Sequence, residues 1–275
     1  MKDDAPIKLD TTRARDKHFL LIADLHSGHR FGLTPPAWWS PEFEAFQRPL
    51  WEGFQDLVKQ APWPIDGVIV DGDAVDGPGH KDNTEHLTTN VKEQGDIAIE
   101  CLEWIDSPVF LFAYGTPYHT VGSFSYEEYI AQHFADRGKD GRIADTLKIL
   151  VNDRHINVRH IVGRSDTAYG QATQAFKEVI RDQARAELYD DRVSDLLVRA
   201  HVHYEFKVGR DGHHVQVLPC LKLPLEILGR KLRTWYYDVG ITWLTVQADG
   251  RIFTDPVKLQ LKVLLPRDQQ EWIRL

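Results

Sequence analysis

Aspartate and histidine recur in this 275-residue chain at spacings that suit a metal centre. Asp24 and His26 follow an apolar run that predicts a buried strand, and they stand two positions apart. Because side chains on an extended segment repeat every two residues, the carboxylate and the imidazole point the same way. Converging oxygen and nitrogen donors are ligands for a hard or borderline divalent ion. For these two residues alone, an ion pair at a strand end is the simpler alternative.

Further apolar segments end in side chains of the same chemical kind. In chain order they deliver Asp73 with Asp76, His119, His160, and His201 with His203. Loops at one edge of a shared sheet are where an α/β scaffold collects such residues. His155 competes with His160, but His160 stands at the end of its predicted strand and His155 at the start. The recurrence along one chain favours a metal site over unrelated ion pairs.

The segments between these residues predict alternating strands and helices. Apolar runs predict strands near 20–23, 66–73, 109–113, 147–151, 156–161 and 195–198. Helical spacing of apolar residues predicts helices over 49–60, 84–104, 126–134 and 172–188. Residues 137–145 predict a polar loop, and Asp-Gly pairs at 211–212 and 249–250 predict hairpins. We therefore expect a single α/β domain over residues 1–275, with an irregular leader over 1–16.

Composition describes an ordinary globular protein, with 42% hydrophobic and 27% charged residues. The formal net charge of −8 argues against a broadly basic nucleic-acid-binding surface. A phosphate substrate stays compatible with it, since bound cations would neutralise acidic ligands. No apolar stretch is long enough to span a bilayer, and the charged start lacks a signal-peptide core. Cys101 and Cys220 fit a reducing compartment or one disulfide, so we expect a cytoplasmic protein without membrane contact.

Taken together, the motifs resemble those of the calcineurin-like metallophosphoesterases. The matching residues are Asp24 with His26, the segment 72–77 (Gly-Asp-Ala-Val-Asp-Gly), and the segment 200–203 (Ala-His-Val-His). The resemblance runs from Phe19 to the final strands. The Gly-Thr-x-x-His form of the third motif and the late segment 238–240 look most like predicted phosphoesterases of phage or prophage origin.

The resemblance implies a central two-layer β-sandwich of mixed sheets flanked by helices in four layers. It also implies two divalent metal ions, with Asp24, His26 and His203 at the first. Asp73 would bridge the ions, and His160 and His201 would hold the second. Imidazole and carboxylate ligands without thiolate suit Mn, Fe, Zn or Ni, and the sequence does not choose among them.

The third motif departs from the family pattern, which is Gly-Asn-His. Here Gly115 is followed by Thr116, Pro117 and Tyr118 before His119. We expect His119 to be catalytic, either as a ligand in place of the missing Asn or as the acid that protonates the leaving oxygen. Thr116 is too weak a ligand to be the first choice, and a solvent-exposed loop histidine is the alternative for His119.

Two more residues enter the candidate site. Asp76 is expected to orient a metal ligand, and Arg164 to contact the phosphate of the substrate. The second motif continues after Asp76 with Gly77 instead of the usual Arg-Gly. We expect hydrolysis of a phosphomonoester or phosphodiester by metal-activated water. A nuclease is the alternative within enzymes, and a non-catalytic, metal-stabilised binding or phage-assembly module is the alternative outside them.

Overall fold

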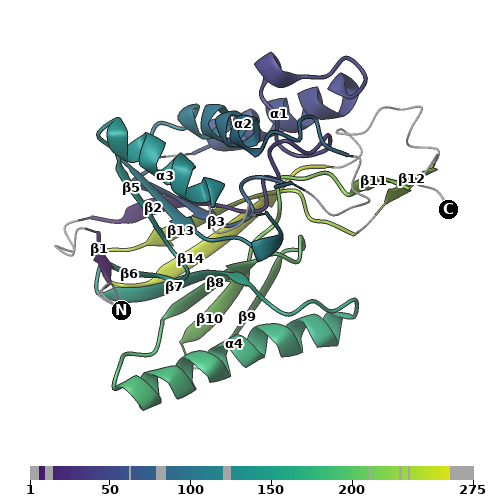
Figure 1. The fold of residues 1–275 in the computed structure, drawn as a ribbon. Coiled ribbons are helices and arrows are strands. Elements are labelled where there is room, and N and C mark those ends of the chain that lie inside the picture. Colours follow the sequence, from purple (N-terminus) through teal and green to yellow (C-terminus); the bar gives the residue numbers. More distant parts are fainter. Residues whose placement is uncertain are drawn as a thin grey trace.

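The computed structural model of the protein describes residues 6–9, 15–61, 63–78, 85–119, 125–210, 212–228, 231–234 and 236–260. Two six-stranded mixed sheets pack face to face, with helices α1 to α3 outside one sheet and α4 outside the other (Figure 1). The α/β sandwich flanked by helices that the motifs implied is therefore confirmed.

The first sheet has the strand order β14-β13-β2-β3-β4-β5. Its strands are β2 (Lys17–Ile22), β3 (Gly67–Asp71), β4 (Val109–Ala113), β5 (Asp140–Ala144), β13 (Gly240–Val246) and β14 (Ile252–Lys258). Strands β2 to β5 are parallel, whereas β13 and β14 are antiparallel to their neighbours. Its outer face is covered by α1 (Glu44–Lys59), α2 (Val91–Glu103) and α3 (Tyr126–Asp136).

The second sheet has the order β1-β6-β7-β8-β10-β9. Its strands are β1 (Ile7–Lys8), β6 (Leu147–Val151), β7 (Arg154–Ile161), β8 (Leu196–Ala200), β9 (Phe206–Arg210) and β10 (His213–Val217). Strands β7 and β8 are parallel, so both end at the same edge of the sheet. A separate hairpin of β11 (Leu225–Leu228) and β12 (Lys231–Thr234) projects beyond the sandwich (Figure 1).

Three sequence predictions were wrong in detail. Residues 137–145 contain the edge strand β5, whose Gly141 looks like a turn residue. Glycine is needed there because a Cβ would lie 2.4 Å from the carbonyl oxygen of Ala131 in α3. Helix α2 begins at Val91 because the Asn90 side chain caps it by accepting from the Lys92 amide. The leader expected to be irregular contains β1, which pairs with β6, and residues 1–5 and 10–14 lie outside the described residues.

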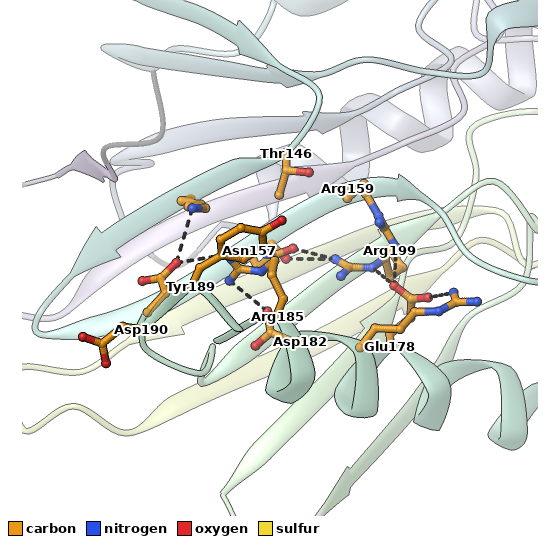
Figure 2. Close-up of a pocket in the computed structure, with 12 residues that line it drawn as sticks. Thr146, Asn157, Arg159, Glu178, Asp182, Arg185, Tyr189, Asp190 and Arg199 are labelled. Atoms are coloured by element: carbon orange, nitrogen blue, oxygen red, sulfur yellow. Dashed lines mark hydrogen bonds and ion pairs between the residues drawn. The ribbon is translucent and has the colours of Figure 1, made fainter. Parts of the chain in front are cut away.

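On helix α4 (Ala168–Tyr189), two carboxylates face the second sheet. Glu178 accepts from Arg199 of β8 at 2.8 Å, from Arg159 of β7 at 2.6 Å and from Arg181 of its own helix at 2.6 Å (Figure 2). Asp182 caps the amide of Ser194, which precedes β8. Burial alone would raise the pKa of Glu178, but the arginines outweigh burial and lower it. These bonds tie α4 to the strand that leads to His201.

We expect Glu178→Gln to lower the free energy of unfolding by about 3 kcal/mol at pH 7. The guanidinium of Arg199 is only 3% exposed, and the substitution would remove the carboxylate that neutralises it. The folded-state pKa of Glu178 lies below the unfolded value of about 4.3, so its contribution is complete above that pH. The contribution fades as the pH falls through the lower, folded-state pKa. Urea unfolding across this pH range measures it, with Glu187→Gln on the exposed face of α4 as control. A penalty that is independent of pH would contradict the assignment.

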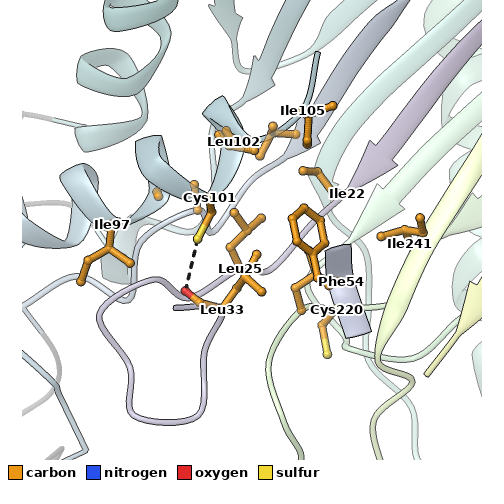
Figure 3. Packing of buried hydrophobic residues seen from close by; sticks show 14 of the residues in the cluster. Ile22, Leu25, Leu33, Phe54, Ile97, Cys101, Leu102, Ile105, Cys220 and Ile241 are labelled. Atoms are coloured by element: carbon orange, nitrogen blue, oxygen red, sulfur yellow. Dashed lines mark hydrogen bonds between the residues drawn. The ribbon is translucent and has the colours of Figure 1, made fainter. Parts of the chain in front are cut away.

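Apolar side chains fill three layers among the described residues, and the smallest lies between the second sheet and α4. One cluster lies between the sheets and includes Leu21, Ile69 and Val198. The largest cluster lies between the first sheet and its helices, where Ile22 and Phe54 pack (Figure 3). Cys101 and Cys220 are both buried and free, so the disulfide alternative is not formed. No described helix has the length and apolar character that crossing a membrane requires.

Candidate metal centre

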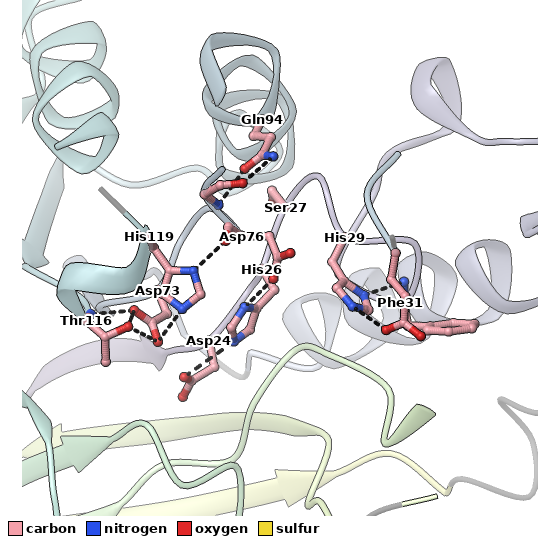
Figure 4. A network of polar contacts seen from close by, with 12 residues as sticks. Asp24, His26, Ser27, His29, Phe31, Asp73, Asp76, Gln94, Thr116 and His119 are labelled. Atoms are coloured by element: carbon pink, nitrogen blue, oxygen red, sulfur yellow. Dashed lines mark hydrogen bonds and ion pairs between the residues drawn. The ribbon is translucent and has the colours of Figure 1, made fainter. Parts of the chain in front are cut away.

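The candidate residues gather at one end of the sandwich, where parallel strands of both sheets finish. They come from five strand ends: Asp24 and His26 follow β2, Asp73 and Asp76 follow β3, His119 follows β4, His160 is the next-to-last residue of β7, and His201 and His203 follow β8. Asp73, Asp76 and His119 lie beside Asp24 and His26 in Figure 4. His155 lies at the other end of β7.

A first group of donors consists of Asp24, His26 and His203. The Asp24 Oδ1 lies 3.2 Å from the Nε2 of His203 and 3.8 Å from the Nε2 of His26. The two imidazole Nε2 atoms are 3.2 Å apart. The other carboxylate oxygen of Asp24 accepts from the backbone amide of His201 at 3.1 Å, which orients the carboxylate. Two nitrogens and one oxygen therefore converge within reach of one ion.

A second group consists of Asp73, His160 and His201. The Asp73 Oδ2 lies 2.9 Å from the Nε2 of His160 and 4.0 Å from the Nδ1 of His201. The Nε2 of His160 is also 3.7 Å from Asp24 Oδ1, so the two groups are adjacent. All six residues expected to be ligands thus fall into the two sets that the sequence motifs implied.

Hydrogen bonds fix the tautomers of three of these imidazoles. The Nδ1–H of His160 donates to the carbonyl oxygen of Asp71 at 2.5 Å, and that of His119 to the carbonyl oxygen of Asp76 at 2.6 Å. The Nδ1–H of His26 donates to the Asp76 carboxylate at 2.9 Å. In each ring Nε2 is the nitrogen that faces the centre. Partners of this kind orient imidazoles in metal sites.

The backbone at the candidate ligands is unusual. Among the described residues other than glycine, positive φ values occur at Asp24, His26, Asp73, His201, His203, Asn152, Asp153 and Asp190. Local structure explains the last three positive φ values. Asn152 and Asp153 form the turn between β6 and β7, and Asp190 ends α4. The other five are candidate ligands. Strain of this kind persists where the surrounding structure imposes it, typically at functional sites.

The donor set fits divalent ions. The Asp24 Oδ1 and the His160 Nε2 are buried without a hydrogen-bond partner among the described residues. His160 Nε2 lies close to Asp73 but lacks hydrogen-bond alignment with it. Buried polar atoms are otherwise nearly always paired, and a bound ion accounts for both exceptions. Carboxylate and imidazole donors without thiolate match Mn, Fe, Zn or Ni.

Charges are strongly coupled in this centre. Burial opposes ionisation of Asp73, but His160 and His119 outweigh burial and hold its pKa well below the usual range. Burial likewise opposes a charge on His160, yet Asp73 and Asp24 hold its pKa well above the ordinary value. For Asp71, burial outweighs the opposing charges of His160 and Arg199 and raises the pKa to about 7. Asp24 and Asp73 thus carry negative charge that the neighbouring imidazoles balance and that bound cations would neutralise.

His119 lies inside the site and is largely buried. Its Nε2 is 3.3 Å from Asp73 Oδ2, the oxygen that also faces His160. Thr116 stands where the family motif has Asn, and its amide and hydroxyl contact Asp73 Oδ1 at 2.6 and 3.1 Å. Gly115 allows this approach, since a Cβ there would lie 2.2 Å from that same oxygen. Thr116 thus orients Asp73, a contact that the sequence analysis missed.

Asp76 connects the candidate ligand His26 to His86, a histidine that the sequence did not single out. Its carboxylate lies 2.9 Å from His26 Nδ1 and 3.0 Å from His86 Nε2. His29 pairs with Glu85 at 3.2 Å beside this network (Figure 4). His86 and Glu85 lie in the loop before α2 that was predicted to be helical, so their approach to the site had no sequence signal.

Arg164 lies in the loop after β7, at the same end of the sandwich. Its guanidinium is half exposed and lies 3.6 Å from the Asp166 carboxylate. Its expected role in binding the substrate phosphate remains a prediction.

Comparison with family models found no match, and neither did comparison with curated proteins. Solved structures match over most of the chain at low similarity. An archaeal phosphodiesterase has 10% identity and a TM-score of 0.45, covering 87% of this chain and 99% of its own. A predicted phosphoesterase from Streptococcus pneumoniae has 8% identity and a TM-score of 0.37, with 89% and 98% coverage. Vps29 from Entamoeba histolytica, solved with zinc, has 16% identity and a TM-score of 0.35, with 88% and 98% coverage. Similarity this low assigns no function.

Proposed function

We propose that this protein hydrolyses a phosphate ester, either a monoester or a diester, with two divalent metal ions as cofactors. One observation carries the proposal. Six carboxylate and imidazole side chains from four strand ends form two adjacent three-donor sets, in which Asp24 Oδ1 and His160 Nε2 are buried without a hydrogen-bond partner among the described residues. A structural ion needs one such set, whereas an adjacent pair of sets is the arrangement used for phosphoryl transfer.

One ion would be held by Asp24, His26 and His203, and the other by His160 and His201. Asp73 would contact both ions. When bound, such ions lower the pKa of water and neutralise charge on phosphoryl oxygens. The chain's own residues supply orientation. Asp76 fixes the ring of His26, and the Asp71 carbonyl fixes the ring of His160.

His119 is the residue placed to handle a proton. Its Nδ1–H is engaged by the Asp76 carbonyl, which leaves Nε2 as the atom directed at the centre. Asp73 and burial act on it in opposite directions, and the pKa of His119 is raised to about 9, so the ring carries a proton at neutral pH. Either this nitrogen ligates an ion or it delivers a proton to the leaving oxygen.

Metal titration with a substrate panel tests the proposal. We expect purified protein to bind two ions per chain and to hydrolyse a p-nitrophenyl phosphomonoester or bis(p-nitrophenyl) phosphate. A chelator should abolish turnover while the circular dichroism spectrum persists, because the apolar layers do not depend on the ions. Mn, Fe, Zn and Ni are then added back separately, and single-stranded DNA tests for nuclease activity.

The non-catalytic alternative makes different predictions. A protein that binds metal, unfolds on chelation and hydrolyses none of these esters would use the ions only to stabilise its fold. That result would refute the proposed hydrolase, since both ion sets would then be occupied without turnover.

A further inference from the structure

A second cleft lies on the outer face of the first sheet, where α1 has ended and leaves β13 and β14 uncovered. Its volume is about 700 Å³. The lining residues are Asp16, His18, Gln60, Trp63, Trp243, Thr245, Gln247, Phe253, Asp255 and Val257. His18 is near the start of β2, six residues before Asp24, so the cleft and the metal centre are roughly 20 Å apart along the strand.

Strand register explains why these side chains meet. His18 of β2 pairs with Thr245 of β13, which pairs with Phe253 of β14. One row further along, Trp243 pairs with Asp255. Residues two apart share a face of a strand, so the two rows lie side by side on the outer face. Trp63, from the loop after α1, closes the row by stacking on His18 at 4.1 Å between ring centroids.

The walls of the cleft are aromatic. Trp63 and His18 form one stacked wall, Trp243 forms the floor and is nearly buried, and Phe253 is 48% exposed at the open edge. Two polar atoms of the lining, Trp63 Nε1 and Gln247 Oε1, are buried without a hydrogen-bond partner among the described residues. The aromatic faces thus lie beside polar side chains, which include the carboxylates of Asp16 and Asp255.

The charge of the lining is one-sided. Asp16 and Asp255 contribute carboxylates, and no Lys or Arg lines the cleft among the described residues. Burial lowers the pKa of His18, with Asp66 and Asp16 acting in the opposite direction. Nearby guanidinium groups have partners outside the cleft. Arg15 pairs with Asp66, and Arg251 pairs with Asp249 while lying 6.0 Å from the Phe253 ring centroid.

We propose that this cleft binds a small organic cation, an alkylammonium group held over Trp63, Trp243 and Phe253 and paired with Asp255. Aromatic faces carry negative electrostatic potential and attract such groups without requiring hydrogen bonds. An anionic ligand in the cleft would be repelled by the carboxylates of Asp16 and Asp255, with no lining cation among the described residues to compensate. The cleft therefore does not suit the phosphate compounds that the metal centre would bind. The cleft is thus a second site with a chemistry opposite to that of the first.

Choline and 3,3-dimethyl-1-butanol, its uncharged analogue of the same shape, test the proposal. Calorimetry and the indole N–H resonance of Trp63 are followed in the presence of chelator, so that metal-bound states do not contribute. We expect the analogue to bind at least ~10-fold more weakly than choline. Phe253→Leu and Asp255→Asn should each weaken choline binding ~3- to 10-fold, because both side chains are exposed and act directly on the cation.

Asp106→Asn is the matched control, since it removes one exposed carboxylate at a distant position and should leave choline binding unchanged. Equal binding of choline and its analogue would overturn the proposal in favour of a merely apolar cleft. Absence of choline binding, or binding that is insensitive to both cleft substitutions, would overturn it as well. None of these outcomes depends on whether the metal centre hydrolyses phosphate esters.

Discussion

Asp73→Asn is expected to lower phosphodiester hydrolysis by at least ~10³-fold, about 4 kcal/mol of transition-state stabilisation. Asp73 is the carboxylate that both donor sets would share, through the oxygen that lies 2.9 Å from His160 Nε2. An amide group coordinates metal weakly and bridges two ions poorly. We expect the metal content to fall below two ions per chain in the same variant.

The fold should survive this substitution. The amide oxygen of Asn can still accept from Thr116, and its NH2 group can donate to the Nε2 atoms of His160 and His119. Thermal unfolding and metal analysis separate the two effects, with Asp56→Asn on the exposed face of α1 as the charge-matched control. Wild-type turnover at saturating Mn would contradict the shared role of Asp73.

His119→Ala is expected to lower the rate by ~10²- to 10⁴-fold, the range for removal of a proton-transfer group. Metal analysis then separates its two possible roles. Loss of one ion per chain identifies a ligand in place of the family's Asn. Full metal content with a slow rate, worst for esters with poor leaving groups, identifies the acid.

The geometry sharpens this comparison. Because His119 Nε2 and His160 Nε2 face the same oxygen of Asp73, a ligand role would make the two histidines equivalent in metal loss. His133→Ala on α3 serves as control, since that imidazole pairs with Glu103 away from the site. Unchanged rate and metal content in His119→Ala would leave His119 as a bystander.

The ends of the buried strands could be predicted from the sequence, whereas the edge strand β5 could not. Buried strands such as β4 are continuous apolar runs, and the chemistry begins where each run stops, so Asp24, Asp73 and His160 could be found from sequence. Strand β5 could not, because an edge strand covered on one face by α3 has little apolar signal, and its Gly141 is explained only by the nearby helix.

Apart from Asp76, the partners that orient the ligands could not be predicted from the sequence, for a different reason. Thr116 acts through its backbone amide as well as its hydroxyl, and an amide carries no residue-type signal. His86 reaches Asp76 from a loop ten residues further along the chain, a proximity that depends on how that loop returns to the sandwich. Periodicity and spacing in the sequence predict which residues are neighbours on one helix or strand. They do not predict contacts between separate loops.

The left-handed backbone at Asp24, His26, Asp73, His201 and His203 has a consequence for how this protein can change. Glycine occupies such conformations at little cost, whereas other residues lose about 1–2 kcal/mol each. Selection for thermal stability alone would therefore favour glycine at all five positions and would erase every one of these donors. A homologue that no longer binds metal could accept glycine at these positions without losing function. Glycines at these five positions in a related sequence would therefore indicate that it has lost the metal site.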